Sequence, residues 1–76
     1  MTRFTFSLSR AGVASDAGVV IAGTFTEALD ALAREPQVAL GDTIEIGVLG
    51  FPPARYECVR LGESRRALQP VGRLAA

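Results

Sequence analysis

Apolar and polar side chains alternate along the first ten residues. Phe4, Phe6 and Leu8 are separated by threonine and serine, and this period of two predicts a β-strand over residues 3–10 with one buried and one solvated face. Gly12 follows the strand, and glycine readily adopts positive φ. We therefore expect a hairpin turn at residues 11–12.

Residues 13–22 have the composition of the returning strand. Four apolar residues share one face of the alternation: Val13, Ala17, Val19 and Ile21. Asp16 and Gly18 are poor strand formers, so the pattern also predicts a bulge or an interruption close to them.

Residues 24–35 have the spacing of an amphipathic helix. Its apolar face consists of Phe25, Ala28, Leu29 and Leu32. Thr24 and Glu27 have capping-box spacing, in which the hydroxyl accepts from the amide three residues on and the carboxylate reaches back to the cap amide. Pro36 disfavours the helical conformation at residue 35, so we expect the helix to end near there.

The pattern after the helix predicts further strands. Gly41-Asp42 is a turn signal, and residues 43–48 then alternate with three side chains facing inward: Ile44, Ile46 and Val48. Residues 55–61 are apolar on both faces, with Tyr56 and Cys58 on one and Val59 and Leu61 on the other. This leaves open which face is buried. Residues 67–71 form a short last strand, and Pro70 places it at an edge.

The predicted element order is β-β-α-β-β, with residues 67–71 as a fifth strand. It indicates an α+β fold in which four or five mostly antiparallel strands form one sheet and the helix packs on one face. Residues 1–76 make a single domain. The order is similar to the β-grasp, or ubiquitin-like, architecture. The likeness is topological, and the tail GRLAA lacks the terminal Gly-Gly of conjugated members.

A second likeness covers residues 23–33, GTFTEALDALA. This stretch resembles the segment that enters the helix in HicB-type antitoxins, where a glycine and a threonine precede an EAL helix. The resemblance implies an antitoxin-like regulator. Any capped amphipathic helix that follows a strand has the same pattern, so both interpretations stay open.

Composition removes several kinds of chemistry. The chain has no histidine and one cysteine, Cys58, so it lacks the commonest general base and metal ligand and cannot form an internal disulfide. We expect no catalytic, cofactor-binding or metal-binding residues, and no enzyme activity. The single cysteine and the absence of an apolar run of about 20 residues predict a cytoplasmic protein that does not enter a membrane.

Two side-chain groups still carry candidate chemistry. Glu45 and Glu57 lie on neighbouring predicted strands and could face each other as an acid/base pair. The alternative places Glu45 on the outward face and pairs Glu57 with an arginine. Cys58 is either a reactive thiol or a small buried hydrophobe, and the adjacent Glu57 raises the pKa of a thiol.

The stretch GVLGFPPARY, residues 47–56, joins two predicted strands with an aromatic and two prolines. Pro52 and Pro53 fix the backbone and make the loop stiff, so little entropy is lost on binding. Phe51, flanked by Leu49 and Tyr56, then forms a binding hot spot. In the alternative, Phe51 folds back and closes an open end of the small core.

The 76 residues carry eight basic and eight acidic side chains, and every basic one is arginine. This usage is typical of GC-rich bacterial and phage genomes. The small size, the balanced charge and the missing catalytic residues predict a small non-enzymatic protein-binding regulator or inhibitor that forms a homodimer. In kind it looks like the anti-CRISPR proteins of phages. The expected partner-binding residues are Leu49, Phe51, Pro52, Pro53, Arg55, Tyr56, Arg60, Arg65 and Arg66.

A nucleic-acid-binding or antitoxin-like regulator is the alternative function. It would use Arg60, Arg65, Arg66 and Tyr56, with Arg73 adding to the positive excess of the last third. Zero net charge and the lack of a known nucleic-acid motif count against it.

Overall fold

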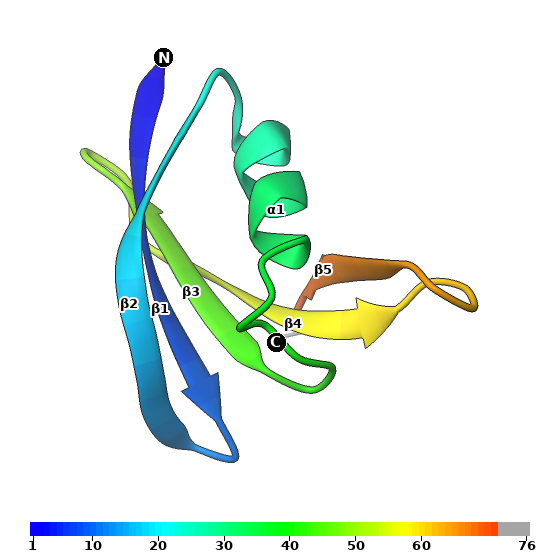
Figure 1. Cartoon of the computed structure of the whole chain (residues 1–76). Coiled ribbons are helices and arrows are strands. Elements are labelled where there is room, and N and C mark those ends of the chain that lie inside the picture. Colours follow the sequence, from blue (N-terminus) through cyan, green and yellow to red (C-terminus); the bar gives the residue numbers. More distant parts are fainter. Residues whose placement is uncertain (72–76) are drawn as a thin grey trace.

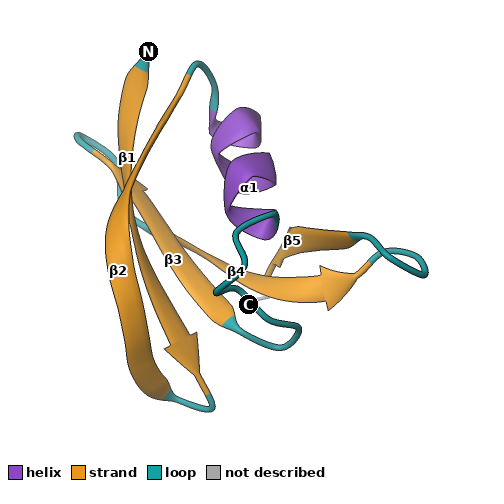
Figure 2. Cartoon of the chain, viewed as in Figure 1, coloured by secondary structure: helices purple, strands orange, loops and turns teal. Residues whose placement is uncertain are grey.

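The computed structural model describes residues 1–71, which form one five-stranded sheet and one helix (Figures 1 and 2). The elements are β1 (Thr2–Arg10), β2 (Val13–Ala22), α1 (Phe25–Ala33), β3 (Thr43–Val48), β4 (Ala54–Arg60) and β5 (Arg66–Pro70). The strand order is β2-β1-β3-β4-β5, and all neighbours are antiparallel. The α+β fold class is confirmed, including the fifth strand.

The β1–β2 hairpin forms where the sequence places it. Ala11 and Gly12 have φ of 54° and 81°, and two positive φ values in a two-residue loop match the twist of the flanking strands. The register of the two strands shifts between Leu8 and Ser9, opposite residues 14–16. This is the bulge that Asp16 predicts.

Only one face of β2 packs inward. Val20 lies opposite Phe4 and Gly18 opposite Phe6, and directly paired residues share a side of an antiparallel sheet. Val19 and Ile21 therefore lie on the outer side, where they are 43% and 53% exposed. The apolar face that the sequence identifies on this strand is the solvated one.

Helix α1 begins with reciprocal capping bonds. The Thr24 hydroxyl accepts from the Glu27 amide at 3.1 Å, and the Glu27 carboxylate accepts from the Gly23 amide at 2.9 Å. The second bond reaches one residue further back than a capping box requires. The helix ends at Ala33 with Arg34 as its C-cap, slightly before the expected end.

The core lies between the inner face of the sheet and α1 (Figure 1). Its buried members are Phe4, Leu8, Ala22, Ala28, Leu32, Val38, Ile44, Ile46 and Cys58. Tyr56 and Cys58 point inward from β4, which answers the question of its buried face. The Cys58 thiol is 1% exposed, and burial raises its pKa. The interpretation of Cys58 as a small buried hydrophobe fits this environment.

Candidate functional site

The β3–β4 loop turns sharply at its start. The Phe51 amide donates to the Val48 carbonyl at 3.1 Å, and Gly50 has φ of +94°, a conformation that side chains other than glycine's rarely adopt. Pro52 and Pro53 follow directly, and each ring fixes its own φ. The short segment from residue 49 to residue 53 is therefore a stiff support.

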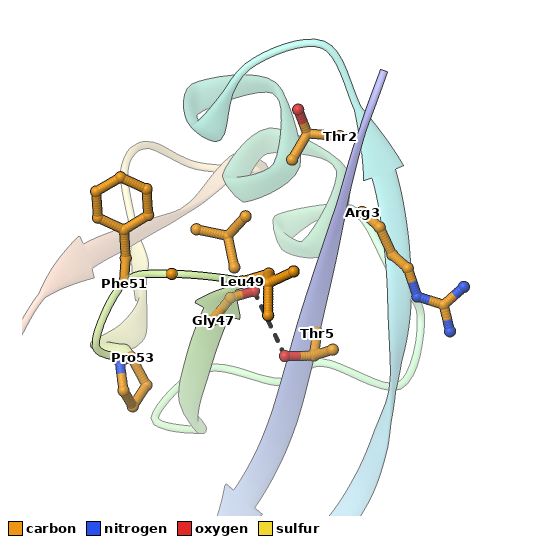
Figure 3. Close-up of a pocket in the computed structure, with 9 residues that line it drawn as sticks. Thr2, Arg3, Thr5, Gly47, Leu49, Phe51 and Pro53 are labelled. Carbon is orange, nitrogen blue, oxygen red and sulfur yellow. Dashed lines mark hydrogen bonds between the residues drawn. The ribbon is translucent and has the colours of Figure 1, made fainter.

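This support holds two large apolar side chains in solvent. Leu49 is 97% exposed and Phe51 is 72% exposed, and Figure 3 shows Phe51 projecting from the loop. At this exposure Phe51 does not close the end of the core. Phe25 of α1 contacts Phe4 edge-on and Tyr56 at a tilt, with 5.8 Å between ring centroids in both pairs.

An open groove of about 890 Å³ lies beside the loop (Figure 3). Its walls are Thr2, Arg3 and Thr5 from β1, and Gly47, Val48, Leu49, Gly50, Phe51 and Pro53 from β3 and the loop. A Cβ on Gly47 would approach the Thr5 hydroxyl to 3.3 Å. The absence of a side chain at residue 47 therefore leaves this part of the groove open. An open, largely apolar groove can receive part of a macromolecular surface, whereas small-molecule sites enclose most of their ligand.

The outer face of the sheet carries two further exposed apolar side chains, on β2. Val19 pairs with Thr5, and Ile21 pairs with Arg3, in neighbouring positions of β1. Thr5 also pairs with Gly47 on the other side. Between Val19 and Ile21 and the loop, the outer face of β1 carries Arg3 and Thr5, so polar side chains separate the two apolar surfaces.

The two glutamates of β3 and β4 do not form a carboxylate pair. Glu45 lies opposite Arg55 and binds its guanidinium at 2.8 Å, whereas Glu57 lies opposite Thr43 and Gln69. Glu45 faces outward as expected, and Arg55 pairs with Glu45, not with Glu57. Both side chains of the ion pair are well exposed, so the pair contributes little to stability.

The remaining arginine candidates gather at the β4–β5 hairpin, away from the loop. Arg60 donates to the Glu63 carbonyl at 3.1 Å, and Arg66 donates to the carbonyls of Val38 and Glu35. Arg65 and Arg66 also line a polar depression of about 460 Å³ together with Asp30, Ala33, Arg34 and Ser64. Arg73 lies outside the described residues.

Tyr56 does not join either group of candidates. Its half-buried ring packs on Phe25 at the rim of the core. The structure therefore separates the expected partner-binding residues into four places: the loop, the outer face at Arg55, the hairpin, and the rim of the core at Tyr56.

Sequence reasoning missed one polar centre altogether. Asp42 is only 2% exposed, and Arg10 at the end of β1 binds both of its carboxylate oxygens, at 2.9 and 2.8 Å. The carboxylate also accepts from the Ala39 amide at 2.8 Å, and Arg10 donates to the Gln37 carbonyl at 2.9 Å. The hydrogen bonds from Arg10, more than the opposing effect of burial, lower the pKa of Asp42.

The Arg10–Asp42 pair is a structural link between β1 and the α1–β3 connection. The backbone amide of Cys58 donates to the Asp42 carbonyl at 2.9 Å, which ties β4 to the same point. The only signal in the sequence was Gly41-Asp42 as a turn. Nothing local in it indicated an arginine 32 residues away.

Within residues 1–71, no three side chains of the metal-binding types His, Cys, Asp and Glu gather in one place. No helix in that part of the chain has the length and apolarity needed to cross a membrane. Comparisons of the chain with protein-family models, curated proteins and solved structures found no match.

Proposed function

We propose that this chain is a non-enzymatic, cytoplasmic protein-binding regulator or inhibitor. It docks on its partner through the loop patch, which consists of Leu49, Phe51, Pro52 and Pro53. The observation that carries this proposal is the exposure of Leu49 and Phe51, at 97% and 72%, on a backbone stiffened by two prolines.

The loop patch has the physical properties of a binding hot spot. Burying one such apolar side chain contributes about 1.5–3 kcal/mol, and aromatic anchors dominate many interfaces. The two prolines reduce the entropy that the loop loses on docking. The adjacent groove offers a complementary hollow for a side chain of the partner.

The rest of the molecule suits a blocking role. The chain has no net charge and no histidine, and the described residues offer an apolar surface rather than an enclosed polar cavity. A compact domain of this kind inhibits by covering a surface of a larger machine, as anti-CRISPR proteins of phages do. We propose that it acts as a homodimer, which would present two loop patches.

The nucleic-acid alternative draws support from one feature, the grouping of Arg60, Arg65 and Arg66. Two of these guanidinium groups already donate to backbone carbonyls, and Tyr56 faces the core instead of joining them as a stacking surface. The loop patch is therefore the better supported site.

The test compares three forms of the protein as bait in a lysate of the host cell: wild type, Leu49→Ala/Phe51→Ala, and Val13→Ala. Val13 is a matched control, because it is 68% exposed and lies at the opposite end of the sheet. Mass spectrometry identifies the proteins that wild type and Val13→Ala retain and that the loop variant loses. A wild-type bait that retains the same proteins as the loop variant contradicts the proposal.

Calorimetry with the purified partner then gives the size of the effect. A hot-spot side chain contributes about 2 kcal/mol or more, so the loop variant should bind at least about 30-fold more weakly. A fourfold rise in salt should change this binding little. Three phosphate contacts would weaken binding about 40-fold over the same range, so a steep salt dependence would favour the nucleic-acid alternative.

A further inference from the structure

The two edges of the sheet differ in how well they resist pairing with another strand. The edge strand β5 has five residues, contains Arg66 and ends at Pro70. The edge strand β2 has ten residues, contains no proline, and carries Asp16 as its only charge. A long edge strand without proline or lysine presents a row of unpaired N–H and C=O groups to another strand.

Residues 16–22 of β2 form an uninterrupted template. They pair with β1 without a register shift, whereas the bulge lies beyond Asp16. Gly18 does not break the strand: it pairs with Phe6 in the same register, and the Phe6 ring lies 3.0 Å from where a Cβ would stand. Val19 and Ile21 stand half-exposed on the outer side of the same stretch.

The stretch is complementary to itself in one register. Two antiparallel copies related by a two-fold axis perpendicular to the sheet and centred on Val19 pair all seven residues, 16 with 22 and 17 with 21. Val19 then meets Val19 of the second copy, and Ala17 meets Ile21, so exposed apolar side chains form cross-strand pairs. Asp16 lies opposite Ala22, whereas a centre at Asp16 would place two carboxylates together.

We propose that this chain forms a closed two-fold dimer in which the β2 strands of two copies pair antiparallel about Val19. The inference deepens the homodimer in the proposed function and rests on it. We favour a second copy of the chain as the partner of the β2 edge because the two Asp16 carboxylates do not face each other in this register. The short β5 edge with Pro70 does not offer a second template, so assembly stops at two chains.

The dimer leaves the loop patch free. In the strand order β2-β1-β3-β4-β5, β1 and β3 separate the β2 edge from the β3–β4 loop. The two-fold axis is perpendicular to the sheet, so both copies of α1 cover the same face of a continuous ten-stranded sheet. Each dimer then carries two loop patches. A partner with two sites would be bound more tightly, because the first contact raises the effective concentration of the second patch.

The first experiment measures the mass of the full chain by light scattering and sedimentation over a concentration series. Wild type should be dimeric. Val19→Lys places two ammonium groups directly opposite each other, and it should raise the dissociation constant of the dimer at least about tenfold. Val13→Lys is the matched control on the same strand outside the paired residues. It should leave the dimer unchanged, as should Leu49→Ala/Phe51→Ala.

The second experiment tests the register. Directly opposed residues in antiparallel strands have Cα atoms about 4.5–5.5 Å apart, within the span of a disulfide. Under mild oxidation Val19→Cys should cross-link the two chains, whereas Ile21→Cys should not, since the two positions lie about 13 Å apart along the strands. Native Cys58 is buried and does not compete. The Ala17→Glu/Ile21→Lys variant sets opposite charges face to face and should dimerise more tightly than either single variant.

The outcomes separate this inference from the binding function. A wild-type chain that stays monomeric at all concentrations overturns the dimer, while partner binding through Leu49 and Phe51 can still be measured. A dimer that tolerates Val19→Lys, resists cross-linking at Val19 and gains nothing from the charge pair overturns the β2 surface but not the homodimer. Loss of partner binding with an intact dimer in the loop variant supports both.

Discussion

The two ends of the β1–β3 ladder depart in opposite directions from the usual separation of polar and apolar side chains. At one end, which we call the closed end, the carboxylate of Asp42 is 2% exposed and binds Arg10. At the other end, Leu49 and Phe51 are 97% and 72% exposed. A buried charge and an exposed aromatic ring are both uncommon.

Folding accounts for one of these departures and not for the other. At the closed end, Asp42 accepts hydrogen bonds from Arg10 and from the Ala39 amide, which compensates for its removal from water. At the loop, exposed apolar surface gains nothing within residues 1–71. This difference is the reason why we propose the loop patch as the binding site and expect the closed end to contribute to stability.

Of the two ends, the closed end should show the larger effect on stability. Asp42→Ala removes three hydrogen bonds to a buried carboxylate. Breaking a fully buried ion pair costs about 3–5 kcal/mol. Because the Arg10 side chain is 53% exposed and regains water, we expect a loss of about 2–3 kcal/mol. A domain of this size has about 4–11 kcal/mol in all, so urea unfolding should show a much lower midpoint.

The matched control is the exposed ion pair. Glu45→Ala removes the partner of Arg55 on the outer face, where a surface pair contributes at most about 1 kcal/mol. Equal losses in Asp42→Ala and Glu45→Ala would contradict the view that burial makes the closed end the stronger link.

The second prediction is acid sensitivity from the same carboxylate. Hydrogen bonding from Arg10 lowers the pKa of Asp42 below its ordinary value of 3.8. A lowered pKa means that the folded state binds the proton less readily than the unfolded state, so this stabilisation is complete above 3.8. It is lost as pH falls through the lowered value. Urea unfolding at neutral pH and in increasing acid should show this loss, and Asp42→Ala should show less of it. A variant as acid-sensitive as wild type would contradict the assignment.

The fold was predictable wherever the pattern was local. The alternation at Phe4, Phe6 and Leu8, the alternation of residues 43–48 and the cap at Thr24 each depend on neighbours within a few positions. The hairpin turn was also local, because Gly12 supplies one of its two positive φ values. These local patterns agree with one another, and together they were sufficient to predict the α+β class and the place of the helix.

The rest depended on contacts between distant parts of the chain. Asp42 is buried beside Arg10, which lies 32 positions away in the sequence. No local pattern in the sequence indicates this contact. Val19 and Ile21 look like core residues, but β1 turns the other face of β2 inward. Phe51 stays outside, and the ring that contacts Phe4 and Tyr56 is Phe25 of α1, which lies more than 20 positions from each of them.

The third prediction concerns the stiffness of the loop. Pro52→Ala gives the unfolded chain more conformations, and the folded loop keeps the same side chains exposed. We expect a loss of about 0.4–1 kcal/mol in unfolding free energy and weaker partner binding from a looser loop. Val13→Ala, at the opposite end of the sheet, serves as the control. A more stable Pro52→Ala variant would indicate that the proline is strained in the folded loop.

The smallest expected effect on stability is the most informative about function. Phe51→Ala removes a ring that is 72% exposed, so the unfolding free energy should change by no more than about 0.5 kcal/mol. Phe4→Ala is the matched control, because it removes the same atoms from a side chain that is 4% exposed. The unfolding free energy should fall by about 3–5 kcal/mol. If Phe51→Ala destabilised the protein as Phe4→Ala does, the ring would belong to the fold, and its exposure would no longer point to a partner. If it leaves stability intact while partner binding falls, the ring contributes to binding and not to folding, as the contrast between the two ends of the sheet requires.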